Sequence, residues 1–599
     1  MPQNKQFILA IVLSALVVFA WQFLVYEPPG EPAQPSEQQT IPAGTMSEGS
    51  LAPTPSGENA APAAEPGTLL SPSQALALTP RIAIDTPKIK GSINLKGARI
   101  DDLKLRDYRV TTNPSSPIIT LLSPADTAKA YYVDQGWAAG NGDTAVVPTS
   151  KTVWTATPGA RLTPSHPVTL SWDNRHGLIF KRTISVDDHY LFTIRQQVEN
   201  TSGKPVKLFP YALISRHGTP KTAGFYILHE GMIGSFDDDE LAQTKYDDLQ
   251  EESEPQSHET VGGWLGITDK YWAVALIPDQ TRAVKARFLD TKTAGGDVYQ
   301  ADYLLRDGIR VPPGATASYQ SRLFSGAKVV QLVDGYASQY RIKHFDLLID
   351  WGWFYFITKP MFWLLEFFKA MVGNFGIAIL MTTVVVKLLF FPLAHKSYVA
   401  MSKMKKLQPE LMKLRERYRG DRVKQQEAMM ALYKKEKVNP ASGCLPMVIQ
   451  IPVFFSLYKV LFVTIEMRHA PFFGWIKDLS APDPTSVFNL FGLLPWTPPG
   501  LLMIGVWPLI MGMTMWVQMR LNPTPPDRVQ AKLFNLMPIF FTFLLARFPS
   551  GLVIYWAWNN TLSVLQQYVI MRRQGVEVAL LSNILQGLGL GRQKGVKKL

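Results

Sequence analysis

The sequence has 599 residues, a formal net charge of +13 and a single cysteine. That length is sufficient for two or three domains, and one cysteine excludes an intramolecular disulfide. The basic residues are clustered, because residues 395–443 carry thirteen Lys and Arg against five acidic residues, and residues 572–599 carry six against one. The first interpretation of such clustering is that it sets which side of a membrane each segment faces, and the second is nucleic-acid binding.

The N-terminal segment is apolar over residues 7–25, a length that spans a bilayer. A cleaved signal peptide is the alternative, but it would have small residues before its cleavage site, whereas the bulky Trp21 and Tyr26 follow this core. We therefore expect a transmembrane anchor at 1–26. Residues 27–80 are rich in Pro, Ala, Glu, Ser and Gly, which predicts a disordered tether.

The next 260 residues or so have a different pattern. Residues 81–340 contain short runs that alternate apolar and polar residues, separated by Gly, Asp, Asn and Pro, which predicts a large β-sandwich. Residues 345–371 are aromatic but interrupted by charges such as Lys359 and Glu366. This composition is typical of an amphipathic helix that lies in the membrane interface.

Five candidate spans follow, of which one is short and contains Pro538. They cover residues 373–394, 445–465, 500–519, 533–548 and 551–571. With the N-terminus inside, the sandwich lies outside and both the basic segment 395–443 and the tail 576–599 lie inside, as the positive-inside rule requires. The predicted fold is a multi-span α-helical membrane protein with six transmembrane helices and a large extracytoplasmic β-sandwich.

The basic segment between the first two of these spans has a helical pattern of its own. Met404 and Leu411 recur at coiled-coil spacing, and Met430 belongs to the apolar edge of a second helix. We predict a cytoplasmic helical hairpin at 396–437. Its basic faces are either a contact surface for a ribosome or emerging chain, or simply a solvated surface near anionic headgroups.

Lys387 lies in the middle of an apolar run, VVVKLLFFPL. A lysine at mid-membrane costs roughly 2.5–3.5 kcal/mol on insertion scales. At 1.5 Å per residue it lies about 12 Å from the inner end of its span. A lysine side chain reaches roughly half of that distance, so its ammonium group cannot easily extend to the headgroups. The acidic candidates Glu366 and Glu466 fall near the outer face. We therefore expect a water-filled cavity open to the cytoplasm.

Further polar residues occur at similar depth in the predicted spans. Each could be a hydrogen bond between helices, but together they favour one hydrophilic groove around Lys387. These residues are Thr383, Gln450, Asn560, Ser563 and Gln567.

The sequence contains no phosphate-binding G-x-x-x-x-G-K-[ST] loop and no tight metal-ligand spacing among its nine His. The acidic run 237–240 is interpreted as a solvated loop. We expect no cofactor, no metal site and no catalytic residue. Two alternatives stay open: a small-molecule transporter, which would have a charged pair across its bundle, and a membrane-tethered sugar-binding protein or epimerase, with His176, His189 and Glu199 as scattered candidates.

Four segments show a specific resemblance. LQPELMKLRERY, EAMMALYKKEKVNPASGCLPMVIQIPVFFSLYKVL, RHAPFFGWIKDLSAPDP and FPSGLVIYWAWNNTLSVLQQ closely resemble the YidC/Oxa/Alb family of membrane protein insertases, through most of 340–575. The anchor, tether and external sandwich resemble the Gram-negative form. The resemblance implies an insertase core of five transmembrane helices within 373–575. It also implies insertion, folding and assembly of inner-membrane proteins, alone or beside the Sec translocon.

The implied partners are nascent membrane proteins, the lipid bilayer, and the ribosome through the hairpin and tail, with no nucleotide. Both termini would be cytoplasmic and residues 27–345 periplasmic.

In the family a positive residue in the first core span faces the groove, and Lys387 occupies that position where arginine is usual. Lysine keeps the charge but lacks the planar fork of donors. Trp556 falls where the family often has an aromatic in the groove wall, and the external sandwich resembles a sugar-mutarotase fold.

Overall fold

The structure is a computed structural model that describes residues 70–575, apart from 141–144, 225–227, 237–239, 253, 294, 437, 439–444, 497 and 523–527. The predicted anchor, the tail and most of the tether and of the acidic run 237–240 lie outside the described residues. The last part of the predicted tether is ordered. It forms a short helix, α2 (Pro72–Ala77), because Ser71 and Gln74 build a capping box at its start.

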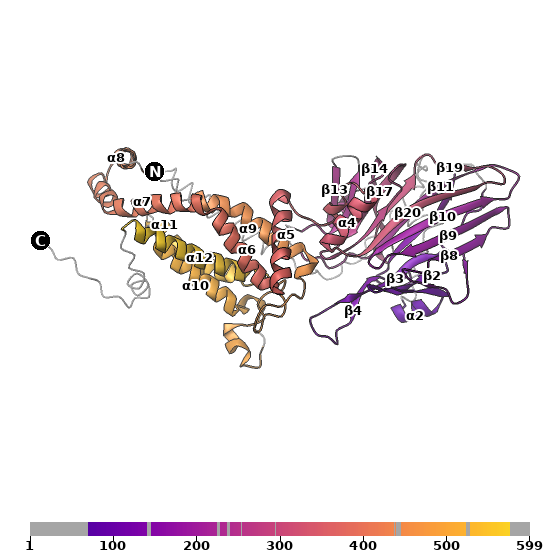
Figure 1. Cartoon of the computed structure of the whole chain (residues 1–599), viewed down its shortest axis with the longest axis horizontal. Coiled ribbons are helices and arrows are strands. Elements are labelled where there is room, and N and C mark those ends of the chain that lie inside the picture. The colour runs from indigo at the N-terminus through magenta and orange to yellow at the C-terminus, as the bar shows by residue number, and fades with distance from the viewer. Residues whose placement is uncertain are drawn as a thin grey trace, which may run out of the picture. The chain divides into compact units, whose positions relative to one another are not determined.

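Two sheets form the domain that follows (Figure 1). Within the described residues the first has eleven strands. In spatial order they are β14 (Gln256–Val261), β17 (Ala283–Thr293), β18 (Gly296–Leu305), β11 (Val206–His217), β5 (Tyr131–Ala139), β3 (Arg99–Arg109), β2 (Ile89–Asn94), β1 (Arg81–Asp85) and β7 (Arg161–Leu162), with β19 (Ile309–Val311) beside β11 and β4 (Ile118–Leu122) beside β3.

The second sheet has nine strands in the part of the chain that the structure describes. They are, in spatial order, β13 (Glu240–Lys245), β12 (Gly231–Phe236), β15 (Trp264–Thr268), β16 (Trp272–Ile277), β20 (Thr316–Ala327), β10 (Leu191–Asn200), β9 (Leu178–Val186), β8 (Val168–Asp173) and β6 (Thr155–Ala156). A short helix, α3 (Tyr246–Glu251), follows β13.

The alternating sequence pattern explains how the sheets pack. In β9 every second side chain is buried, and Phe180 and Ile184 from this strand share one core cluster with Phe288 of the opposite sheet. Strand β10 pairs antiparallel with β9, and its Ile194 lies opposite Ile184. The predicted β-sandwich is therefore confirmed, since period-two patterning buries one face of each strand.

The aromatic segment after the sandwich is helical over fewer residues than predicted. After α4 (Val330–Tyr340) come a 3-10 turn, η1 (Phe345–Leu348), and α5 (Tyr355–Val372), so the regular helix begins ten residues later than expected. Gly352, between η1 and α5, has a left-handed backbone conformation with φ 73°, which glycine adopts without strain.

The C-terminal region is helical. Its helices are α6 (Phe375–Leu389), α7 (Phe391–Arg417), α8 (Arg422–Lys435), α9 (Leu445–Val463), α10 (Val506–Leu521), α11 (Arg528–Leu545) and α12 (Ser550–Arg573). Figure 1 shows α10, α11 and α12 running together, and α12 also contacts α6 and α9. Judged by length and apolar composition, no single helix among the described residues meets the criteria for crossing a membrane; α6 and α7 meet them only as a pair, bent by 68°.

The bend between α6 and α7 corrects the first predicted core span. We expected one helix over 373–394, followed by a separate hairpin. Instead α6 ends at Leu389 and α7 runs without interruption from Phe391 into the predicted hairpin. Pro392 lies in the first turn of α7, where its missing N–H breaks no helical hydrogen bond, and this explains why the new helix starts there.

Candidate functional site

Lys387 forms a hydrogen bond between two helices. It is half-buried near the end of α6, and its Nζ donates to Ser563 Oγ of α12 at 2.8 Å. The Ser563 hydroxyl in turn donates to the Asn559 carbonyl, one turn earlier in α12, at 2.8 Å. Ser563 is positioned by its own helix, so it offers a fixed acceptor to the ammonium group.

A small cavity lies beside the ammonium group of Lys387. Its volume is about 30 Å³, and a buried water needs roughly 10–15 Å³ of such space. The cavity therefore has room for about two waters. Its lining residues come from α6, α7, α9 and α12, and they are Val386, Lys387, Phe390, Leu393, Ala394, Tyr398, Gln450 and Gln566.

No carboxylate within the described residues forms an ion pair with Lys387. The polar neighbours are neutral: Tyr398 hydrogen-bonds to Ser563, and Gln450 Nε2 donates to the Tyr555 hydroxyl at 2.8 Å. An ammonium group has three N–H donors, and one of those of Lys387 is bound to Ser563. The cavity has room for water that would accept hydrogen bonds from the others.

The structure brings only part of the predicted set to this cavity. Thr383 is 2% exposed and donates to the Ile379 carbonyl of its own helix at 2.7 Å. Trp556 packs against Phe454 at a ring distance of 4.5 Å. Both lie outside the cavity lining. By contrast, Gln566 lines the cavity, and in the sequence it lies beside the polar stripe of α12.

The rest of the α12 stripe contacts α10 and the residue that follows it. Asn560 Nδ2 donates to Thr514 Oγ1 at 3.4 Å, and Gln567 Nε2 donates to Asn522 Oδ1 at 3.0 Å. Within the described residues the side-chain oxygens of Asn559 and Gln567 are buried without a hydrogen-bond partner. Buried polar atoms of this kind are commonly satisfied by water.

A second lysine of the apolar helices was missed by the sequence reasoning. Lys459 of α9 forms an ion pair with Asp350 at 2.6 Å, and the carboxylate also accepts the His229 N–H at 3.0 Å. This pair joins α9 to the segment before α5 and does not link two helices of the bundle. The missed signal is the aspartate before α5, which is distant in sequence but lies next to the C-terminal end of α9.

The predicted hairpin residues differ in burial. Leu411 of α7 is 8% exposed, Met404 is half-buried, and Met430 of α8 is 47% exposed. The base of the hairpin is attached to the bundle, because Lys406 Nζ donates to the Gln574 carbonyl after α12 at 2.8 Å. The exposed Met430 lies on a helix rich in Lys and Arg.

The candidate sugar-binding residues do not converge. His176 lies in the turn before β9 and His189 in the turn after it, so they are at opposite ends of a nine-residue strand. At about 3.3 Å per residue these ends are roughly 30 Å apart. Glu199 pairs with Lys181 at the surface. No group of three or more metal-binding side chains occurs among the described residues.

Known protein families match both parts of the chain. The YidC periplasmic domain matches residues 81–364, and the 60Kd inner membrane protein family matches residues 367–577. The chain is 55% identical to the membrane protein insertase YidC of Nitrobacter hamburgensis, over 98% of this chain and 97% of that protein. It is 53% identical to the protein of the same name from Rhizobium etli, over 99% of both.

Solved structures show weaker similarity. A crystal structure of an active YidC insertase with its first transmembrane domain resolved is 19% identical, covers 83% of this chain and 96% of that one, and has a TM-score of 0.33. A galactose mutarotase related enzyme from Lactobacillus acidophilus is 9% identical, covers 41% of this chain and 97% of that one, and has a TM-score of 0.27.

Proposed function

The chain belongs to the YidC family of membrane protein insertases, and from this membership we propose that it inserts newly made membrane proteins into the bacterial inner membrane. Its direct partners are then nascent membrane proteins and the lipid bilayer. Insertion makes and breaks no covalent bond, so the protein is not an enzyme.

The observation that carries a mechanism is the environment of Lys387. Its ammonium group is half-buried among apolar helices, bound to a neutral serine and next to space for water. A positive charge held in this way has no carboxylate to neutralise it within the described residues. It is therefore available to attract an acidic group that enters the bundle from the cytoplasm.

The physical problem of insertion is the polar flank of the substrate. An apolar segment gains free energy by entering lipid, but its polar flank must cross the hydrocarbon. Water at Lys387 shortens that crossing, and the charge attracts acidic residues in the flank. The substrate then leaves sideways between the helices as its own apolar segment is buried in lipid. No step of this scheme requires nucleotide hydrolysis.

The same proposal includes the membrane topology. Six spans, the anchor at 7–25 and five in the core, place both termini in the cytoplasm and residues 27–345 in the periplasm. The distribution of Lys and Arg supports this orientation. Shorter apolar helices at Gln450–Val463 and Lys532–Leu545 overlap two of the proposed spans.

We further propose contacts with the ribosome and the Sec translocon. The basic hairpin 396–437 and the basic tail 576–599 are suited to ribosomal RNA, which is polyanionic. Deleting residues 401–436 is expected to weaken capture of ribosome-bound nascent chains at physiological salt. Undiminished capture by the deleted chain would rule out the hairpin as the contact.

The central test is a charge series at Lys387. Lys387→Ala and Lys387→Glu are expected to slow insertion of a short substrate with an acidic periplasmic flank about tenfold or more, because the attraction is lost or reversed. Lys387→Arg should stay close to the parent protein, since it retains the charge. The measurement is protease protection of the flank after reconstitution into liposomes.

A substrate with a neutral flank is the matched control. It should depend less on the residue at position 387, because only hydration of the groove then matters. If the alanine and glutamate variants insert the acidic substrate at the normal rate, Lys387 has no part in the mechanism.

A further inference from the structure

A pocket lies where the turn between β3 and β4 approaches the loop after α9. Its volume is about 540 Å³, which is within the range of small-ligand sites, roughly 300–1,000 Å³. Seven residues line it: Asp107, Arg109, Thr111, Thr112, Pro114, His469 and Lys477. The proposed function assigns no role to this pocket.

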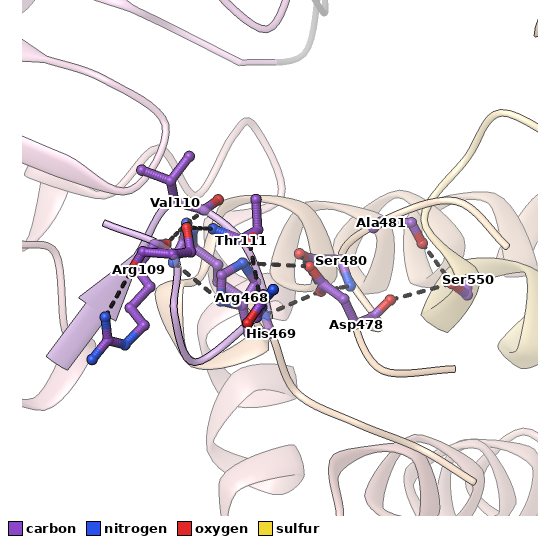
Figure 2. A network of polar contacts seen from close by, with 11 residues as sticks. Arg109, Val110, Thr111, Arg468, His469, Asp478, Ser480, Ala481 and Ser550 are labelled. Carbon is purple, nitrogen blue, oxygen red and sulfur yellow. Dashed lines mark hydrogen bonds and ion pairs between the residues drawn. The ribbon is translucent and has the colours of Figure 1, made fainter. Parts of the chain in front are cut away.

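The two sides of the pocket are held together by hydrogen bonds. Arg468 Nη2 donates to the carbonyls of Arg109 and Val110, at 2.5 and 3.4 Å. Figure 2 shows this contact and its continuation into the loop, where Asp478 accepts the backbone N–H of His469 at 3.1 Å. The Ser550 hydroxyl at the start of α12 donates to the Ala481 carbonyl at 2.5 Å.

The charge of the pocket is predominantly positive. Arg109 and Lys477 contribute positive charges, and Thr111 and Thr112 contribute hydroxyls. His469 adds no charge at neutral pH, because burial and the nearby Arg468 lower its pKa. The single acidic residue, Asp107, is already paired with Lys88 at 2.6 Å. Within the described residues Lys477 has no hydrogen-bond or ion-pair partner and its side chain is exposed. Such a set of donors suits a phosphate group.

The neighbouring side chains indicate where that phosphate comes from. Phe473 and Trp475 lie on the same loop as Lys477 and are 60% and 42% exposed. The indole N–H of Trp475 donates to Asp483 at 3.1 Å, so the ring is held in place although the residue remains exposed. Exposed aromatic side chains next to basic ones are typical of a surface at lipid headgroup depth.

We propose that this pocket binds the phosphate of an anionic lipid headgroup in the outer leaflet. Arg109 and Lys477 bind the phosphate oxygens, Thr111 and Thr112 donate further hydrogen bonds, and Phe473 and Trp475 contact the acyl-chain boundary. The bound lipid then anchors the loop that covers the beginning of α12. This site is independent of the insertion activity at Lys387.

The test uses the full chain in a neutral detergent. Dioctanoyl phosphatidylglycerol is titrated and the bound lipid is counted by native mass spectrometry. The double variant Arg109→Ser/Lys477→Ser is expected to bind about tenfold more weakly, because two charged donors are lost. The control Lys204→Ser/Arg310→Ser removes the same charge from exposed positions of the sandwich and should bind like the parent.

Two comparison ligands identify the source of the phosphate. Weaker binding of dioctanoyl phosphatidylcholine and of inorganic phosphate supports an anionic lipid. Equal binding of phosphatidylcholine overturns recognition by charge, and inorganic phosphate that binds as tightly as the lipid overturns the lipid assignment. Parent-like binding by the double variant overturns the site itself. If that variant misfolds, Lys477→Ser decides, with a loss of about threefold expected.

Discussion

Lys387 and Glu466 are both titratable groups at low exposure, but their surroundings differ. The partner of Lys387 is a serine hydroxyl, and the cavity beside it admits water. Glu466 lies just after α9, where its Oε1 accepts the Val330 N–H at the start of α4 at 3.0 Å. Burial raises the pKa of Glu466 to about 7, and the nearby Glu366 acts in the same direction. Below about pH 7 the carboxyl group of Glu466 is therefore neutral in the folded protein.

The stability of the protein should depend on pH through Glu466. The stabilisation from its neutral form is complete below the pKa of the unfolded chain, about 4.3, and is lost as the pH rises through about 7. We expect the thermal midpoint to fall as the pH rises from about 4.3 to about 7, and this group to add no further fall above that pH. Glu466→Gln should remove this fall, because the amide stays neutral and its oxygen still accepts the Val330 N–H.

The matched control for this titration is Glu251→Gln, at an exposed position of α3. It should leave the pH dependence as in the parent. If the thermal midpoint of the Glu466→Gln protein falls with rising pH as much as that of the parent, another group controls the pH dependence.

At the scale of elements, the bundle depends on close contact between α10 and α11. Gly512 of α10 faces Thr542 of α11, and a Cβ built on the glycine would lie 2.0 Å from Thr542 Oγ1. The Thr542 hydroxyl is already committed to the Pro538 carbonyl at 2.8 Å. Small residues at such positions let helix backbones approach each other, which is how helices associate in lipid.

Gly512→Val should therefore destabilise the bundle. Overpacking of this kind typically costs about 1–3 kcal/mol, and thermal unfolding in detergent should show a lower midpoint. Met513→Val is the control, because Met513 is adjacent in α10 but 68% exposed. Equal midpoints for the two variants would contradict the close packing at Gly512.

At the scale of the whole molecule, one short segment connects the helices to the sandwich. In this segment Lys459 forms an ion pair with Asp350, and Glu466 accepts the N–H of Val330. Arg468 donates to a backbone carbonyl at the end of β3. Lys459 and Asp350 retain side-chain exposures of only 11% and 16%. Removing one partner therefore leaves the other charge largely desolvated.

Lys459→Ala is expected to destabilise the full chain by about 2 kcal/mol or more. A double-mutant cycle with Asp350→Asn, followed by thermal unfolding, should give a coupling free energy of about 1–3 kcal/mol. Lys181→Ala breaks the exposed pair with Glu199 and serves as the control, with an expected change below about 1 kcal/mol. Additive effects at 459 and 350 would mean that the pair contributes no coupling.

The β-sandwich and the helical C-terminal region followed from local patterns, and so did the proposal for Lys387. Alternating strands such as β9 bury every second side chain, and a charge within an apolar run is conspicuous whatever surrounds it, because both signals depend only on neighbouring residues. The Ser563 contact, the cavity beside Gln566 and the pair between Lys459 and Asp350 required the folded chain. Each joins residues that are about a hundred or more positions apart, and such contacts arise from how helices pack rather than from the order of the amino acids along any one of them.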